Sequence, residues 1–256
     1  MSRRRFFVSG VHRPNDVVSI EGSDAHHIAD VLRLRAGDRI EIIDSAARAF
    51  VAELGGDERH VQARLLEERP HAVERQHLRV DVAQSMPKGS KMDAVVQKGT
   101  ELGAALFLPF WSERTVARRA GAEKVERWRR IARSAAEQSG RREVPAVVEP
   151  VAFDDVLARF CAYDLVLFAW EGSNDEPLHD RLPRLLARAE SVLVVIGPEG
   201  GFSHAEAEAA RARGAHVIWL GERILRTETA APALLAIINY EREGRNESAS
   251  RRSKAQ

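Results

Sequence analysis

The sequence predicts an α/β protein in which a small β-barrel precedes a larger domain with a mostly parallel sheet. Three features of the 256-residue chain lead to this prediction. The first part contains short, partly alternating apolar segments separated by turn residues. From Leu78 onwards, strand-like segments alternate with helical ones, which is the pattern of a parallel α/β sheet. The polar segment 68–73, which contains a proline, separates the two patterns and marks the domain boundary.

The N-terminal part, residues 1–72, has the short strands and turns of a small barrel. Its strand candidates are Phe6–Val8, Arg39–Asp44, Phe50–Leu54 and Val61–Leu65, with turns at Gly37 and Gly55. One short helix interrupts them, with Ser23 as its predicted N-cap and Ile28, Val31 and Leu32 on its apolar face.

Residues 73–243 are predicted to form the parallel α/β domain. Its strand candidates are Leu78–Val82, Ala105–Phe110, Ala146–Glu149, Leu165–Ala169, Val192–Ile196 and Val217–Leu220. Two helices show a buried stripe, the first through Met92, Val95, Val96 and Leu102, the second through Val125, Trp128, Ile131, Ala132 and Ala135. Residues 244–256 are polar and lack periodicity, so we expect a disordered tail.

Composition excludes several classes of protein. Lys plus Arg is 39 and Asp plus Glu is 38, so a nucleic-acid binder would have to rely on local basic patches. The single cysteine, Cys161, cannot form an internal disulfide, and no Cys/His pair has the spacing of a metal site. The basic start is not followed by an apolar stretch, and the longest apolar run, Ala230–Ile238, contains Pro232. We expect a cytoplasmic protein with no metal and no membrane span.

The first segment that could carry chemistry is a glycine-rich loop after a buried strand. Val192–Ile196 leads into Gly197-Pro198-Glu199-Gly200-Gly201, and Ser203 with Glu206 forms a capping box that opens a helix. Ligands of open α/β sheets bind at such carboxyl ends of strands, and glycines allow close approach of the backbone. The alternative is an ordinary tight turn. Neither a dinucleotide-binding fingerprint nor a P-loop is present.

The second segment repeats this arrangement. The strand Val217–Leu220 leads through Gly221 to a helix whose predicted N-cap is Thr227. Arg226 precedes the cap, where its charge opposes the positive end of the helix dipole. This position indicates an anionic partner for Arg226, or else an ordinary solvated arginine.

Together the two loops resemble the cofactor-binding signature of the SPOUT methyltransferases, and more narrowly that of the RsmE family. The resemblance rests on Gly197–Gly201 followed by Leu220–Ala230. Further segments are similar to the same family, in the same order: Ser23–Asp38, Lys88–Asp93, Gln97–Gly103 and Ala136–Arg141. The two-loop signature is specific, whereas each short segment alone is not.

The resemblance implies an RNA-binding PUA-like barrel and a C-terminal SPOUT domain whose end is threaded into a trefoil knot. It also implies a homodimer that uses S-adenosyl-L-methionine to methylate N3 of a uridine in 16S ribosomal RNA of the small ribosomal subunit. By matching motifs, cofactor contact is expected at Leu167, Ala169, Glu171, Gly197, Glu199, Gly200, Gly201, Leu220, Gly221, Ile224, Leu225 and Arg226. Trp170 belongs to the same first loop.

The chemistry implied by this family requires little covalent help from the protein. Uridine N3 must lose a hydrogen before it attacks a methyl group, so a base or a group that stabilises the anion is needed. Arg226 is the candidate for stabilising the anion, and Glu199 and Glu228 are candidate bases. Either carboxylate could instead organise a loop, a role that we favour for Glu228 in the first turn of its helix.

Several other residues are candidates for RNA contact, although each alone could be a solvated surface charge. The basic set is Arg3, Arg5, Arg33, Arg35, Lys88, Lys91, Arg141 and Arg142. Together they could track an RNA backbone. His26 and His27 are weaker candidates, and both Trp128 and Trp219 are predicted to lie in the core.

Two alternatives remain beside a uridine-N3 methyltransferase. One is a methyltransferase of the same fold that modifies another RNA nucleotide, because fold and cofactor loops do not determine the acceptor atom. The other is an RNA-binding assembly factor with a degenerate pocket, against which the glycines at positions 197, 200, 201 and 221 argue.

Overall fold

The computed structural model describes residues 4–57, 60–70, 78–116, 121–172 and 177–253. The chain divides into two compact units. The first comprises residues 1–75 together with 136–144, and the second comprises residues 76–135 and 145–256. The segment Ala136–Val144 thus belongs with the N-terminal unit, whereas the sequence had placed it in the C-terminal domain.

The first unit is a five-stranded sheet in the order β1-β3-β4-β5-β2. Its strands are β1 (Arg5–Phe7), β2 (Val17–Ser19), β3 (Arg39–Ile43), β4 (Ala49–Asp57) and β5 (His60–Arg69). β1 and β3 are parallel, and the other pairs are antiparallel. Side chains such as Phe6, Ile42, Phe50 and Leu65 form a core of their own. The β-rich prediction is confirmed; the short strand β2 was not predicted.

The short helix of this unit differs in detail from its prediction. It consists of α1 (Gly22–His26) and a π-helical turn η1 (His27–Val31). Glu21, and not Ser23, occupies the N-cap position, and no side chain caps the helix. Of the predicted apolar stripe, Ile28 is buried, but Val31 is 60% exposed. The π turn shifts the side chains away from the 3.6-residue spacing, so the stripe does not face the core as a whole.

Arg5 is a structural residue of the first unit, which corrects the prediction that it contacts RNA. Its guanidinium makes an ion pair with Glu41 at 2.6 Å, and both side chains are 5% exposed. It also donates hydrogen bonds to the carbonyl oxygens of Gly140 and Arg141, just after a helix ends. These contacts use four of the five N–H donors of a buried guanidinium, so Arg5 is not presented to a phosphate on the surface. They also explain why Ala136–Val144 belongs to this unit.

The second unit is a parallel sheet in the order β12-β10-β11-β6-β7-β8, with β9 also paired to β7. Its strands are β6 (Arg79–Ser85), β7 (Leu106–Trp111), β8 (Ala146–Val147), β9 (Val151–Ala152), β10 (Leu165–Ala169), β11 (Ser191–Ile196) and β12 (His216–Ile218). Its helices are α2 (Lys91–Glu101), α3 (Ala122–Ser139), α4 (Phe153–Ala158), α5 (Leu178–Leu185), α6 (His204–Ala212) and α7 (Thr227–Ser253), with a 3-10 turn η2 (Phe160–Ala162). The predicted parallel α/β architecture is confirmed.

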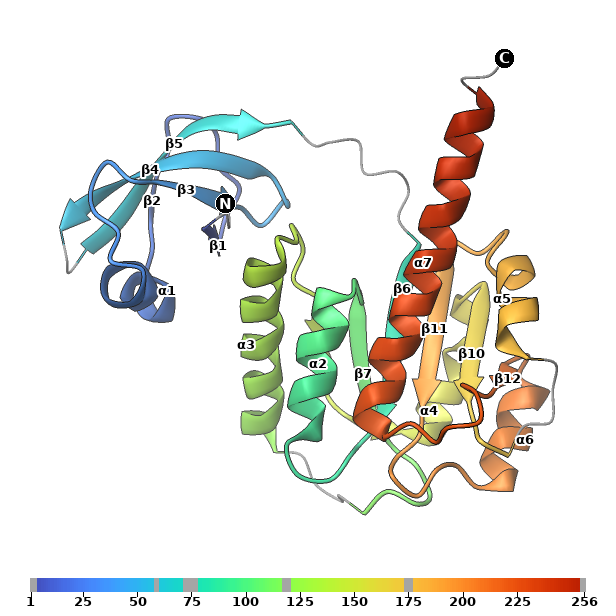
Figure 1. Ribbon diagram of the computed structural model, residues 1–256. Coiled ribbons are helices and arrows are strands. Elements are labelled where there is room, and N and C mark those ends of the chain that lie inside the picture. The colour runs from blue at the N-terminus through green and yellow to red at the C-terminus, as the bar shows by residue number, and fades with distance from the viewer. Residues whose placement is uncertain (1–3, 58–59, 71–77, 117–120, 173–176, 254–256) are drawn as a thin grey trace. The chain divides into compact units, whose positions relative to one another are not determined.

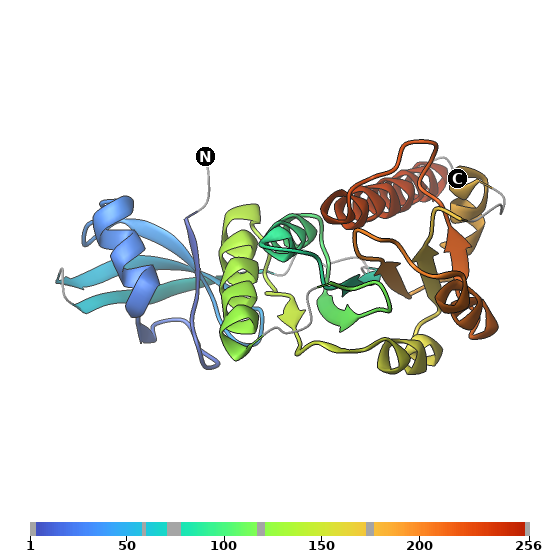
Figure 2. The same ribbon diagram turned by 90° about the horizontal axis from the view of Figure 1, so that it is seen from below.

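Helices cover both faces of this sheet, as the figures show (Figures 1 and 2). Successive residues of each strand point to opposite faces. On β11, Val192, Val194 and Ile196 join the core beneath α2, α3, α5 and α7. Leu193 and Val195 join the core beneath α4 and α6. Burial on both faces explains why this strand is continuously apolar in the sequence.

The C-terminal helix α7 is longer than predicted. It continues through Ser253, so the predicted disordered tail is wrong for residues 244–253. Residues 254–256 lie outside the described part of the chain. Nucleating a helix is costly, whereas adding residues to an existing one is not, so a polar extension can stay helical when its stem is anchored. Ala231, Leu234, Leu235 and Ile238 anchor that stem in the core.

Within the described residues, every helix is either too short or too polar to cross a lipid bilayer.

The Arg5–Glu41 pair yields a prediction for the stability of the first unit. Arg5→Met should lower its free energy of unfolding by about 3–5 kcal/mol, because it leaves the Glu41 charge buried without its main partner. Urea unfolding measures this loss. Removing both charges in Arg5→Met/Glu41→Leu should recover a large part of it. The exposed neighbour Arg4 is the matched control, and Arg4→Met should change stability by about 0.5 kcal/mol or less. Equal effects of the two single substitutions would contradict the buried pair.

Candidate functional site

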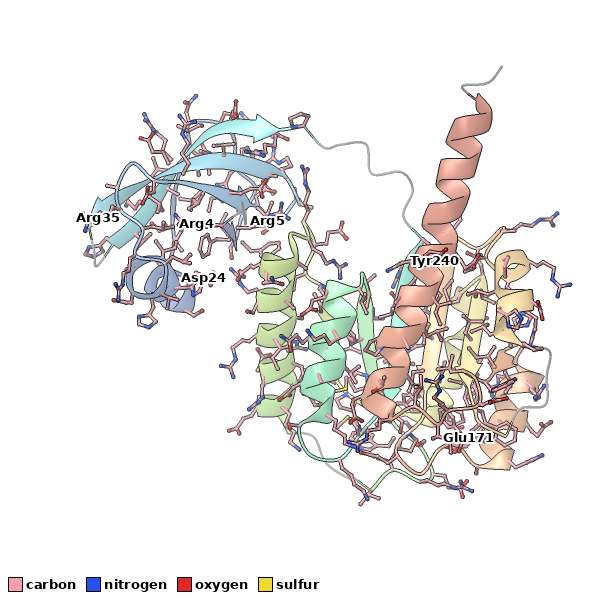
Figure 3. All side chains as sticks on the ribbon, viewed as in Figure 1. Arg4, Arg5, Asp24, Arg35, Glu171 and Tyr240 are labelled. Carbon is pink, nitrogen blue, oxygen red and sulfur yellow. The ribbon has the colours of Figure 1, made fainter. Side chains whose placement is uncertain are left out.

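Three loops meet at the carboxyl edge of the parallel sheet. They follow β10, β11 and β12, which are neighbours, so their carboxyl ends lie side by side. The loops line a cavity of about 800 Å³. Glu171, in the loop after β10, lies at this edge of the sheet (Figure 3). The edge is the one where open α/β sheets bind their ligands.

The loop after β11 is shaped by its glycines and by the helix that follows. Gly201 has φ +64°, a left-handed conformation that strains other residues, and an added Cβ there would overlap the Glu171 carboxylate. The predicted capping box is confirmed: Ser203 Oγ accepts from the N–H of Glu206, and Glu206 Oε2 accepts from the N–H of Ser203. The other Glu206 oxygen accepts from the N–H of Glu113, which fixes the loop after β7 to the same helix end.

The loop after β12 is joined to the loop after β11 by a hydroxyl group. Thr227 Oγ1 donates to the Gly197 carbonyl oxygen at 2.6 Å and accepts from Gln84 Nε2 at 2.9 Å. Thr227 is the first residue of α7 and not its N-cap, which corrects the prediction. Its hydroxyl holds the neighbouring loop and does not satisfy the N–H groups of its own helix.

Charged side chains form a second set of contacts at the cavity wall. Lys91 Nζ lies 2.9 Å from Glu199 Oε1 and 3.5 Å from Glu228 Oε2. The same Glu199 oxygen accepts from the backbone N–H of Lys88 at 3.0 Å. Burial raises the pKa of Glu199, but the hydrogen bonds from Lys91 and Lys88 outweigh it and hold the pKa below its usual value. The hydrogen bond to Glu199 raises the pKa of Lys91, so both groups are charged at neutral pH.

Arg226 lies at the start of α7, on the wall of the cavity. Its carbonyl oxygen accepts from the N–H groups of Thr229 and Ala230, so its backbone is fixed by the first turn of the helix. Its side chain is exposed and has no hydrogen-bond partner or ion pair within the described part of the chain. A guanidinium at the positive end of a helix makes this side of the cavity favourable for an anion.

Comparison with known proteins identifies the family. A model of an RNA methyltransferase domain matches residues 74–239, and a model of an RNA methyltransferase PUA domain matches residues 20–66. The ribosomal RNA small subunit methyltransferase E of Bacillus subtilis is 36% identical over 231 residues, which are 88% of this chain and 90% of that protein. The chain belongs to the ribosomal RNA small subunit methyltransferase E family. This confirms the resemblance to the RsmE family.

Two further members of the family are similar over most of their length. The Synechocystis protein of the same name is 36% identical over 226 residues, 87% of this chain and 72% of that protein. The crystal structure of the Neisseria gonorrhoeae enzyme bound to S-adenosyl methionine superimposes with a TM-score of 0.83 at 29% identity, covering 93% of this chain and 97% of that one.

The structure brings most of the predicted cofactor residues together. The cavity is lined by Ala169, Glu171, Gly197, Glu199, Gly201, Leu220, Gly221, Ile224, Leu225 and Arg226. Two predicted residues lie elsewhere. Leu167 is fully buried in the core beneath α7, because it lies two residues before the end of β10 and so does not reach the loop that follows the strand. Gly200 faces Arg114, whose guanidinium donates to the Gly200 carbonyl oxygen at 3.0 Å.

The predicted RNA-contact residues have diverse environments. Arg33, Arg35 and Lys88 are exposed, while Arg141 and Arg142 are half-buried. Arg142 donates to the Pro70 carbonyl oxygen at 3.3 Å. Lys91 lines the cavity, where its ammonium lies 2.9 Å from Glu199 Oε1 and 3.5 Å from Glu228 Oε2. Arg3 lies outside the described residues.

Sequence reasoning missed several residues of the site. Trp219 was predicted to be core, as Trp128 is, but it lines the cavity. Trp170, which the resemblance had placed in the first loop, does line the cavity, and it donates its indole N–H to the Phe202 carbonyl oxygen, which ties the first loop to the second. Gln84 is buried at the end of β6 and reaches the site through Thr227. A lone amide at the carboxyl end of an apolar strand is the signal that could have indicated Gln84.

No group of three or more His, Cys, Asp or Glu side chains is arranged to hold a metal ion in the part of the chain that the structure describes.

The left-handed backbone of Gly201 gives a prediction with a matched control. Gly214 also has a positive φ, but an added Cβ there meets nothing within 4 Å. Gly201→Ala and Gly214→Ala should each lower the free energy of unfolding by about 1–2 kcal/mol, the cost of a left-handed Ala. We expect similar losses in urea unfolding, because the Glu171 carboxylate is the end of a flexible side chain and can move aside. A much larger loss at Gly201 would show that Glu171 is fixed in the cavity wall.

Proposed function

We propose that this chain is an S-adenosyl-L-methionine-dependent RNA methyltransferase that modifies N3 of a uridine in 16S ribosomal RNA of the small subunit. The observation that carries the proposal is the cavity between the two glycine loops at the carboxyl edge of the sheet. In a chain of this family, one of whose members was crystallised with S-adenosyl methionine, that cavity is the natural cofactor site.

The residues present fit this cofactor. A volume of about 800 Å³ lies in the ordinary range for small-molecule sites. Gly197, Gly201 and Gly221 line the cavity with backbone atoms, since they have no side chain, and apolar side chains such as Leu220 and Leu225 provide walls for a flat ring. Glu171 and Arg226 add charge for polar groups. We assign cofactor contact to the predicted residues that line the cavity.

When bound, the cofactor supplies a methyl group that is already electrophilic, so the protein's task is alignment and proton management. Arg226 is our candidate catalytic residue, because its free guanidinium can stabilise the uracil anion that loses its N3 hydrogen. Glu199 is held by Lys91 and by the Lys88 N–H, and its lowered pKa makes it a weak base. These contacts favour a loop-organising role for Glu199 over the role of base.

We assign RNA positioning to the N-terminal barrel, residues 1–72, with exposed Arg33 and Arg35 as candidate backbone contacts. The proposed working unit is a homodimer. On α7, Ile237 is 42% exposed and Tyr240, which Figure 3 labels, is 78% exposed. These large side chains suit contact with a partner subunit. The trefoil knot also remains part of the proposal. So does the cytoplasmic location, since ribosomal RNA is modified where ribosomes are assembled.

The proposal is tested on small subunits from a strain that lacks the corresponding gene. Purified protein with labelled cofactor should methylate these subunits once, and mass spectrometry of nuclease digests should place the label on N3 of one uridine. Subunits from the parental strain, already modified, should accept none. A label on another base or atom would indicate a different target. Failure to bind the cofactor in calorimetry would favour the assembly-factor alternative.

Arg226 gives the sharpest prediction for the chemical step. Arg226→Ala should bind the cofactor within a few-fold of the parent but methylate roughly 10²-fold more slowly, since it removes one stabilising donor from the anion. Arg226→Lys should recover only part of the rate, because a point charge cannot reproduce planar hydrogen bonds. Single-turnover rates at saturating RNA measure the step.

A matched control is Arg223→Ala, which removes the same charge from the same loop but away from the helix start. It should slow the single-turnover rate much less than Arg226→Ala. A parental rate in Arg226→Ala would remove Arg226 from the chemistry.

A further inference from the structure

The segment 84–91, hereafter the bridging segment, lies outside the glycine loops but is bonded to both of them. It runs from the end of β6 to the first residue of α2. At one end, Gln84 is fully buried and donates to Thr227 Oγ1 at 2.9 Å, with its nitrogen 3.4 Å from the Gly197 carbonyl oxygen. Thr227 itself donates to that carbonyl oxygen. Gln84 therefore joins the loop after β11 to the start of α7.

The other end of the bridging segment makes the same connection with charges. Lys91 Nζ lies between Glu199 of the loop after β11 and Glu228 of the first turn of α7. The Lys91 side chain is 33% exposed, compared with 25% for Glu199 and 20% for Glu228. The N–H of Lys88 adds a hydrogen bond to Glu199. The hydrogen bonds of Gln84 and the ion pairs of Lys91 thus both fix the distance between the loop after β11 and the start of α7.

We propose that Gln84 and Lys91 are positioning residues that hold the two glycine loops in the geometry that binds the cofactor. This inference rests on the proposed function of the cavity. A site built from backbone groups of glycine-rich loops has few side-chain contacts to order it, and glycine loses the most conformational freedom on ordering. Gln84 at the end of β6 and Lys91 at the start of α2 hold the loops before the cofactor binds. Less conformational entropy of the loops is then lost on binding.

The geometry distinguishes this role from RNA contact. A lysine that binds phosphate presents its ammonium to solvent, as exposed Lys88 can. The Lys91 ammonium instead neutralises two carboxylates within the protein. Breaking this arrangement leaves Glu199 and Glu228 close to each other without a countercharge, and their repulsion pushes the two loops apart.

The first test compares three lysines of the full-length protein by calorimetry. Lys91→Met should weaken binding of S-adenosyl-L-methionine by roughly tenfold or more, the scale of one charged hydrogen bond. Lys91→Arg, which keeps the charge, should restore part of the affinity. Lys88→Met keeps its backbone N–H and should alter only RNA affinity. Lys98→Met, on the outer face of α2 where Lys98 pairs with Glu101, should alter neither.

A double-mutant cycle shows whether Lys91 acts through Glu199. If it does, Lys91→Met and Glu199→Gln should be non-additive, so that the double variant binds the cofactor no worse than Lys91→Met alone. Full additivity, or a Lys91→Met protein that loses RNA affinity and keeps cofactor affinity, would overturn the proposal for Lys91.

The buried contact is tested at Thr227, where the conservative variant retains the hydroxyl. Thr227→Ser should keep the KM for cofactor near the parental value, whereas Thr227→Val should raise it several-fold with kcat at saturation little changed. Equal KM values for Ser and Val would overturn the role of the Gln84–Thr227 bond. If the parent protein itself bound no cofactor, the proposed function would fail; if the parent bound normally and no variant differed, only the bridging role would fail.

Discussion

The parallel alignment of β10, β11 and β12 is the constraint on which the rest of the site depends. Because the three strands are neighbours and run in one direction, the loops that follow them must meet at one edge of the sheet. Residues as distant in sequence as Glu171 and Arg226 therefore line one cavity. The helices on both faces make this alignment stable, since they bury both surfaces of every central strand.

Chemically identical side chains have different roles in this fold because their surroundings differ. Arg5 is buried against Glu41 and the end of a helix, where its charge is neutralised and most of its donors are occupied. Arg226 is exposed at the beginning of a helix, where its charge is unopposed among the described residues. Lys88 and Lys91 differ in the same way, one exposed and the other bound to two carboxylates. Burial and partners, and not residue type, decide which cation can meet a substrate.

The predictions that were confirmed depend on short-range patterns. The apolar strand Leu165–Ala169 and the capping box of Ser203 and Glu206 are visible in a few neighbouring residues, and both are present as expected. Some predictions were wrong at the local level, such as the N-cap at Ser23, and others were wrong because they depend on contacts across the fold. The roles of Arg5 and Lys91 were set by Glu41, Glu199 and more distant segments, which no local pattern reveals.

The sequence by itself determined the two-part α/β architecture and the two glycine loops, and through them the family. These features follow from periodicity, turn residues and motif spacing, which are properties of neighbouring residues. Only the tertiary structure decided that Gln84 and Lys91 hold these loops together, that Trp219 lines the cavity and that Leu167 does not. The physical reason is that such contacts join residues more than a hundred positions apart, whose meeting depends on how the whole sheet is assembled.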